Sequence, residues 1–178
     1  RRLIQLAEEW LLLTNPPVPV TEQGVSDYFE ANEETFWAPE RYTLAHVFFP
    51  REREAEVHAL EQAIAAESLT HEQALFRGAP FLPGYQFNQQ TAEQLARQLG
   101  AGFVTNWLAT QPVPQTWSPP VTSTFGWHLV WLDNLTPGRA LSIEEVRPDI
   151  VASLERQRRA DALEEAKQAL RNDYEMML

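Results

Sequence analysis

The segment 121–132 constrains the fold of this chain more than any other, because it joins a tight turn to a strand. It reads Val-Thr-Ser-Thr-Phe-Gly-Trp-His-Leu-Val-Trp-Leu. The Phe-Gly pair indicates the turn, and the alternating residues after it predict a strand over 126–133. His128 lies early in this strand. A second strand-like run at 41–49 contains His46, so the sequence predicts a sheet with two strand histidines.

Helical patterns flank these strands. Apolar residues occur on several sides of a helix over 3–13, so we expect this helix to be buried on more than one face. Thr21 is expected to cap the next helix, and Thr91 to cap a later helix that ends at Leu99. A capping box at 142–145 opens a long C-terminal helix, which we expect to kink or restart at Pro148. The stretch 78–90 is rich in proline and glycine and is expected to be irregular.

These elements predict an α+β protein with a small antiparallel sheet surrounded by helices. The helices at both ends have more apolar surface than each can bury alone, which favours packing between them as a helical lobe. We expect an N-terminal helical segment over 1–38, an α+β domain over 39–138, and a C-terminal helix over 139–178 that packs with the N-terminal segment.

Charge and residue content exclude several functions. The chain has 14 Lys and Arg against 25 Asp and Glu, a net charge of −11. This argues against a nucleic-acid partner, because phosphate backbones require clustered cations. The absence of cysteine excludes thiol chemistry, disulfides and thiolate metal sites. No phosphate loop, nucleophile elbow or metal-ligand cluster is recognised, so we expect no cofactor and no metal.

The start of the chain bears on its partners. It opens on Arg1-Arg2 without an initiator methionine or a signal peptide. We therefore expect a fragment or a processed form, with any membrane anchor outside it. No apolar run approaches the roughly 20 residues that span a bilayer. The apolar helix over 3–13 is expected to dock a partner or to form a homodimer with a second copy.

The order of four motifs resembles the PpiC-type parvulins, a family of peptidyl-prolyl cis-trans isomerases (rotamases). The motifs are Thr-x-Gln-x-Val-x-x-Tyr-Phe-x-x-Asn from Thr21, Pro-Glu-Arg-Tyr-x-x-x-His ending at His46, Phe-Gly-x-His ending at His128, and Glu-Glu-Val-Arg-Pro-x-Ile from Glu144. In exported members, an isomerase domain is flanked by helices that form a chaperone lobe. The resemblance therefore implies a periplasmic or membrane-anchored foldase that acts on X–Pro bonds of unfolded or exported proteins.

The resemblance also implies the residues of the site. His46 and His128 match the paired histidines of the family, and Ser123 matches its Ser/Thr hydroxyl. His71 falls at the place of a family Cys or Asp near the isomerising amide. These four are the predicted catalytic residues. The residues expected to line the proline pocket or to contact the substrate are Phe103, Leu108, Phe125, Phe81, Leu82 and Trp107.

Two departures from the family pattern leave a second function open. Ala79 stands where parvulins have an acid, and 84–100 is an insertion relative to compact members. The alternative is a catalytically degenerate parvulin that acts as a chaperone or peptide-binding module. The histidines are likewise either site residues or buried structural ones, and the pocket aromatics either line a groove or belong to the core.

Overall fold

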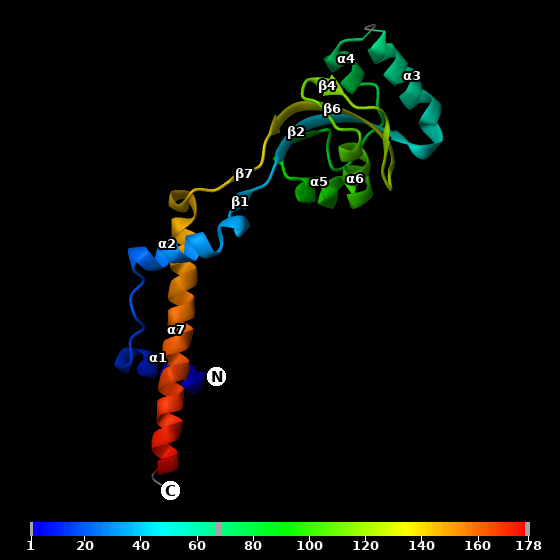
Figure 1. Cartoon of the computed structure of the whole chain (residues 1–178). Coiled ribbons are helices and arrows are strands. Elements are labelled where there is room, and N and C mark those ends of the chain that lie inside the picture. The colour runs from blue at the N-terminus through cyan, green and yellow to red at the C-terminus, as the bar shows by residue number, and fades with distance from the viewer. Residues whose placement is uncertain (1, 67–68, 177–178) are drawn as a thin grey trace. The chain divides into compact units, whose positions relative to one another are not determined.

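The two ends of the chain fold together into one unit, and the segment between them folds into another (Figure 1). The computed structural model describes residues 2–66 and 69–176. The first unit comprises Arg1–Trp37 and Ala140–Leu178, and the central unit comprises Ala38–Arg139. The chain thus crosses between the units twice. Strands β1 (Trp37–Ala38) and β7 (Arg139–Ala140) pair at these crossings.

The central unit is built on an antiparallel sheet of five strands. The strand order is β3-β2-β6-β4, and β5 also pairs with β6. The elements of this unit are, in chain order, β2 (Arg41–Pro50), the 3-10 helix η2 (Arg51–Arg53), α3 (Glu54–Ala65), α4 (His71–Leu75), β3 (Gln86–Gln90), α5 (Ala92–Leu99), α6 (Ala101–Ala109), β4 (Thr116–Trp117), β5 (Val121–Thr122) and β6 (Gly126–Thr136).

Helices cover both faces of this sheet (Figure 1). Successive side chains of a strand point to opposite faces. Strand β2 therefore contributes Leu44 and Phe48 to the core on the side of α5 and α6. It contributes Val47 and Phe49 to the core on the side of α3 and α4. Burial of both faces explains the nearly continuous apolar run of β2, and the predicted α+β class with a small antiparallel sheet is confirmed.

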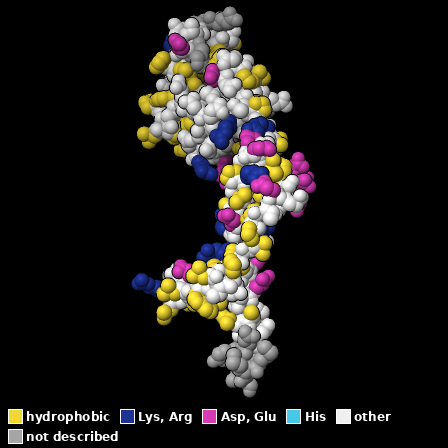
Figure 2. All heavy atoms as spheres, turned by 90° about the vertical axis from the view of Figure 1, so that its left-hand side faces the viewer, with side chains coloured by type: hydrophobic (Ala, Val, Ile, Leu, Met, Phe, Trp, Pro, Cys, Tyr) yellow, Lys and Arg dark blue, Asp and Glu magenta, His cyan; other side chains and the backbone are white. Residues whose placement is uncertain are grey.

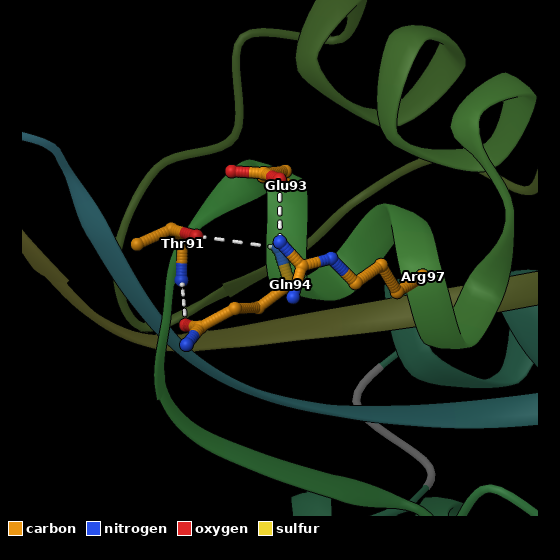
Figure 3. A network of polar contacts seen from close by, with 4 residues as sticks. All are labelled: Thr91, Glu93, Gln94 and Arg97. Atoms are coloured by element: carbon orange, nitrogen blue, oxygen red, sulfur yellow. Dashed lines mark hydrogen bonds and ion pairs between the residues drawn. The ribbon is translucent and has the colours of Figure 1, made fainter. Parts of the chain in front are cut away.

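Helix α5 begins where its sequence predicts, because Thr91 caps it (Figure 3). Thr91 Oγ1 accepts a hydrogen bond from the Gln94 N–H at 3.2 Å, and Gln94 Oε1 accepts one from the Thr91 N–H at 2.8 Å. Both bonds satisfy donors that a helix N-terminus leaves unpaired. Glu93 and Arg97 form an ion pair on the exposed side. The opposite side buries Leu95 completely, which anchors the helix on the sheet.

The unit formed by the chain ends is helical. Its elements are α1 (Arg2–Thr14), α2 (Glu22–Ala31), the 3-10 helix η1 (Glu33–Thr35) and α7 (Ile143–Met176). Both α1 and α2 contact α7 (Figure 1). Thr21 caps α2 as predicted, with its Oγ1 accepting from the Gly24 N–H at 3.1 Å. Val25, Val146 and Ile150 form the buried core between α2 and α7.

Helix α1 is not buried on more than one face, so that expectation is wrong. Of its side chains, Leu11 and Leu12 are buried. Five others are more than half exposed: Leu3, Ile4, Leu6, Trp10 and Leu13. The apolar pattern of a helix shows which surface it can bury, but not how many neighbours are available to cover that surface.

Two further expectations about local structure are wrong in part. Helix α7 continues through Pro148 as one helix, so it does not restart there. Pro148 lies in the second turn, where its missing N–H removes one helical hydrogen bond. The stretch 78–90 is not irregular throughout, because β3 pairs with β2. Its sequence, Gln-Phe-Asn-Gln-Gln, does not predict a strand, because Phe87 is its one apolar residue. The strand forms here because it pairs with the neighbouring strand.

Gly126 is required where β6 begins, because its backbone passes close to β2. An added Cβ would lie 2.3 Å from the carbonyl oxygen of Phe49 and 3.1 Å from Cε2 of Phe48. We expect Gly126→Ala to lower the free energy of unfolding by at least about 2 kcal/mol, since the paired backbone must move apart. Urea unfolding followed by circular dichroism measures this change.

Gly102→Ala is the matched control. A Cβ at Gly102 meets no atom within 4 Å, and the residue lies in α6. Alanine favours a helix over glycine, so we expect this variant to gain up to about 1 kcal/mol of stability. Equal unfolding midpoints for the two variants would contradict the close approach at Gly126.

Candidate functional site

His46 of β2 and His128 of β6 lie on the same face of the sheet, and their rings meet. In the antiparallel register, His46 is opposite Val130 and His128 is opposite Phe48, so the histidines are diagonal neighbours. Their ring centroids are 5.0 Å apart and their Nδ1 atoms 3.1 Å apart. Both side chains are completely buried. The fold therefore brings together the two histidines singled out by the sequence.

The hydrogen bonds of these imidazoles determine where their protons lie. A carbonyl can only accept, so His46 Nε2–H donates to the Gly84 oxygen at 2.9 Å. In a neutral imidazole, His46 Nδ1 is then an acceptor, and His128 Nδ1–H donates to it. His128 Nε2 remains as an acceptor, to which the Ser123 hydroxyl donates at 2.8 Å. All four ring nitrogens thus have partners while both rings stay neutral.

The chain of hydrogen bonds extends into the turn before β6. Ser123 Oγ accepts from the N–H groups of Phe125 at 2.9 Å and Gly126 at 3.3 Å. The Ser123 N–H donates to the Gly126 carbonyl at 2.8 Å, which closes the turn. One directed chain therefore runs from the turn at 123–126 through both strands to the loop at Gly84. It ties together three segments that are distant in sequence, around His46, Gly84 and 123–128.

Burial keeps both imidazoles uncharged. Desolvation lowers the pKa of His46 to about 4, and the hydrogen bond to the Gly84 carbonyl opposes this shift. Desolvation also lowers the pKa of His128 to about 3, with repulsion from His46 as a second cause. The direction for His46 agrees with the assigned protons, since a proton added at its Nδ1 would face the Nδ1–H of His128. The two imidazoles, which form the floor of the site, are therefore neutral at physiological pH.

Aromatic rings enclose the histidine pair. Phe81, from the loop at 78–85, lies perpendicular to both imidazoles, with its centroid 5.2 Å from His46 and 5.5 Å from His128. Phe103 of α6 packs against His128 at 5.0 Å, and Phe87 of β3 stacks on His46 at 5.7 Å. The pair thus lies in an apolar enclosure, which is the physical cause of the low pKa values.

The other predicted site residues lie in different surroundings. Phe125 is half exposed, and its ring meets Phe81 at a centroid distance of 5.5 Å. Leu108 packs partly buried against the core, and Leu82 is fully exposed beside Phe81. Trp107 is completely buried and presents no surface to a ligand. Of the six residues predicted for the pocket, Phe81 and Phe103 have rings that contact the histidine pair. Phe125 contacts Phe81, and Trp107 stacks on Phe103 from within the core.

Three residues that contact the histidine pair were not predicted from the sequence. The side chain of one predicted residue is not among those that the structure describes. Gly84 acts through its carbonyl, which no side-chain pattern reveals. Phe87 lies in the strand that was not expected. Phe48 packs on His128 at 5.3 Å and could have been found, because it follows His46 by two positions on the same face. His71 begins α4, but its side chain is outside the described residues.

The Ser123 hydroxyl donates to His128, as a serine nucleophile donates to its general base, but this pair is not suited to nucleophilic catalysis. A general base works best with a pKa near the operating pH, and the pKa of His128 lies near 3. The Ser123 hydroxyl is also buried among backbone donors. The arrangement therefore supports no covalent chemistry. It offers instead an apolar enclosure on a neutral, hydrogen-bonded floor.

Within residues 2–66 and 69–176, no three His, Asp or Glu side chains gather closely enough to hold a metal ion. In the same residues, no helix combines the length and apolar character needed to cross a bilayer.

Comparison with known proteins places this geometry in context. A family model described as the PPIC-type PPIASE domain matches residues 20–148. Among solved structures, the chain is similar to one of two SurA-like chaperones of Campylobacter jejuni, the virulence factor PEB4 and the periplasmic protein Cj1289. The TM-score is 0.59 with 18% identity, over 96% of this chain and 68% of that one. This likeness supports the fold.

Two weaker structural matches are PrsA proteins. The match to PrsA of Bacillus anthracis, a peptidylprolyl isomerase, has a TM-score of 0.46 and 17% identity, over 92% of this chain and 69% of that one. The match to PrsA of Bacillus subtilis has a TM-score of 0.41 and 14% identity, over 94% of this chain and 59% of that one. No curated protein sequence matches the chain.

The neutral histidine pair predicts a loss of stability in mild acid. Because both pKa values are lowered by folding, the unfolded chain binds more protons below about pH 6.5. The free energy of unfolding should therefore fall as the pH is lowered from 6.5 towards 5, by up to about 1.4 kcal/mol per pH unit for each histidine. Urea unfolding at pH 7, 6 and 5 measures this dependence.

NMR titration of the imidazole C–H signals tests the same pair directly. The signals of His46 and His128 should keep the positions of the neutral form from pH 8 down to pH 5. A midpoint near pH 6.5 for either ring would contradict the neutral floor.

Proposed function

The chain belongs to the PPIC-type family of peptidyl-prolyl isomerases, the parvulins, and on that premise we propose that it catalyses cis-trans isomerisation of X–Pro bonds in unfolded or exported polypeptides. The observation that carries this proposal is the buried, neutral pair of His46 and His128 beneath aromatic rings. We propose that Phe103 and Phe125 contact the proline ring of the substrate and that Phe81 borders the pocket.

The proposed mechanism needs no covalent step. Rotation about the peptide bond faces a barrier of about 18–20 kcal/mol, which arises from amide resonance. An apolar enclosure removes water from the amide and thereby disfavours the charge-separated form that keeps it planar. A neutral floor suits this task, because an imidazolium would hold water in the site. Interactions that are stronger with the twisted amide than with the planar one then lower the barrier.

The hydrogen-bond chain is proposed to keep this floor in place. Ser123 and Gly84 hold the imidazoles of His128 and His46 from opposite ends. A fixed tautomer leaves no ring nitrogen of the pair unpaired, so the histidines need not reorganise during rotation. On the family resemblance, we retain His71 as a candidate catalytic residue and Leu82 and Leu108 as candidate substrate contacts.

We also infer the setting in which the protein acts. Family membership and the SurA-like fold support unfolded or proline-containing polypeptides as substrates. They also support a location outside the cytoplasm, in the periplasm or at a membrane through an anchor outside this sequence. In this proposal the segment 39–138 is the isomerase domain, and the segments 1–38 and 139–178 form a chaperone-like lobe.

A second candidate function is binding without catalysis. Ala79 stands where parvulins have an acid, and the histidine floor is sealed from solvent. The central unit also exposes large apolar side chains, among them Phe76 and Leu82. A degenerate parvulin with such a surface would hold unfolded chains as a chaperone or peptide-binding module.

A protease-free isomerisation assay on a proline tetrapeptide separates the two functions. If the protein is an isomerase, His128→Ala should lower kcat/KM at least about tenfold, since the hydrogen-bonded floor is lost. His58→Ala is the control, because His58 is exposed on α3, and it should leave the rate unchanged. Circular dichroism verifies that each variant is folded.

Other results of this assay would reject the isomerase or its pocket. Wild-type protein that leaves the isomerisation rate unchanged, but suppresses aggregation of an unfolded client at stoichiometric amounts, would establish the binding module instead. Activity that persists in a folded variant carrying both Phe103→Ala and His128→Ala would exclude the proposed pocket.

We further propose that α1 forms a homodimer with a second copy of the chain. Leu3, Leu6, Trp10 and Leu13 follow the 3-4-3 spacing of a coiled-coil seam, and all four are more than half exposed. Figure 2 shows hydrophobic side chains gathered over α1 in the lower part of the view. With Ile4 they give α1 five large apolar side chains that are more than half exposed, a concentration typical of an interaction surface.

Multi-angle light scattering tests the dimer. We expect wild-type protein to show twice the mass of the chain, and Trp10→Glu to shift it to the monomer, since a charge in the seam has no partner. Gln5→Glu is the matched control, because Gln5 is exposed outside the seam, and it should leave the dimer intact. Wild-type protein that remains a monomer at high concentration would reject the homodimer.

A further inference from the structure

The floor of the site and its aromatic wall are sealed from solvent. His46, His128 and Phe103 have no exposed surface, and Phe81 is 8% exposed. A proline ring must contact these groups in order to be held above the histidine pair. It can reach them only after a side chain that covers them has moved.

Phe81 is the covering ring with the freedom to move. Phe48 and Phe87 are fixed in paired strands, and Phe103 is fixed in α6. Phe81 lies in the loop at 78–85, between α4 and β3. The other ring of this loop, Tyr85, lies tilted against His46 at a centroid distance of 6.4 Å but is already 44% exposed.

The loop is anchored by backbone hydrogen bonds that a movement of the Phe81 side chain would leave intact. The Ala79 N–H donates to the Phe48 carbonyl at 2.8 Å, and the Tyr85 carbonyl accepts from the His46 N–H at 2.9 Å. Between these anchors, the Gly84 N–H donates to the Phe81 carbonyl at 3.1 Å. Rotation about χ1 of Phe81 therefore opens the floor without releasing Gly84 from His46.

From these contacts we infer that Phe81 occupies the place of the substrate's proline ring and swings out when the substrate binds. This inference rests on the proposed isomerase function. The Phe81 ring is apolar and faces both imidazoles at similar distances, 5.2 and 5.5 Å between centroids, as a ring held above the pair must do. Phe125 leans on Phe81 from the exposed side and would form the outer wall of the opened pocket.

A closed gate lowers the apparent affinity for substrate. Removing a buried phenylalanine ring from its apolar surroundings corresponds to a factor on the order of 10 to 100 in the closed-to-open ratio. The apparent Kd is raised by the same factor, because only the open form binds. Removing the gate should recover part of this factor, whereas removing a wall of the pocket would weaken binding.

The test is the affinity of a proline tetrapeptide, measured by NMR titration of the imidazole signals. We expect Phe81→Ala to bind at least about fivefold more tightly than wild type, with a lower KM and a smaller change in kcat. Val113→Ala is the control, since Val113 is 58% exposed between α6 and β4, and its Kd should stay within about twofold of wild type. Phe81→Leu, which keeps an apolar side chain of smaller size, should show an intermediate gain and covers the case in which the alanine variant does not fold.

The outcomes separate this inference from the function on which it rests. Weaker binding by Phe81→Ala or Phe81→Leu, with wild type binding normally, would make Phe81 a wall of the pocket and overturn the gate alone. Absence of binding by wild type and by both variants would overturn the proposed function, and the gate with it.

Discussion

The contact between His46 and His128 is the interaction on which the central unit depends. The two imidazoles meet because β2 and β6 pair in a register that makes them diagonal neighbours on one face. A slip of one residue would send one ring to the opposite face, towards α3 and α4. The register therefore specifies the site. The hydrogen-bond chain favours this register in turn, because a different alignment of β2 and β6 would leave buried ring nitrogens unpaired.

The same chain explains why a polar network is tolerated in an aromatic core. Buried polar groups destabilise a fold unless each finds a partner, and here Ser123, both histidines and the Gly84 carbonyl are satisfied in a single direction. Neutrality of His46 follows from this direction, since a proton added at its Nδ1 would face the Nδ1–H of His128. Stability and the proposed chemistry thus have one requirement in common, which is an uncharged floor without water.

The sequence predicted those parts of this arrangement that depend on local patterns. Thr91 predicted the start of α5 as its cap, and the alternation after the Phe-Gly turn predicted β6 with His128. The order of motifs identified the family, and His46 was found with it. The groups that complete the site depend on distant neighbours. The Gly84 carbonyl has no side-chain pattern, and Phe87 lies in a polar strand that forms because β2 is beside it. The exposure of α1 was not predicted for the same reason. The apolar pattern of a helix does not show how many neighbouring elements pack against it.

A sealed floor is consistent with the proposed isomerase, because the low pKa values require it. Desolvation is the largest cause of both shifts, so a permanently open site would admit water and allow the imidazoles to charge at higher pH. A phenylalanine that covers the pair keeps it dry between substrates, and a proline ring that replaces Phe81 keeps it dry during the reaction. Under this proposal, the protein binds substrate more weakly than it would with an open pocket, because Phe81 covers the histidines and keeps them neutral. The divergent loop at 78–85 would then change the affinity for substrate while preserving the chemistry of the floor.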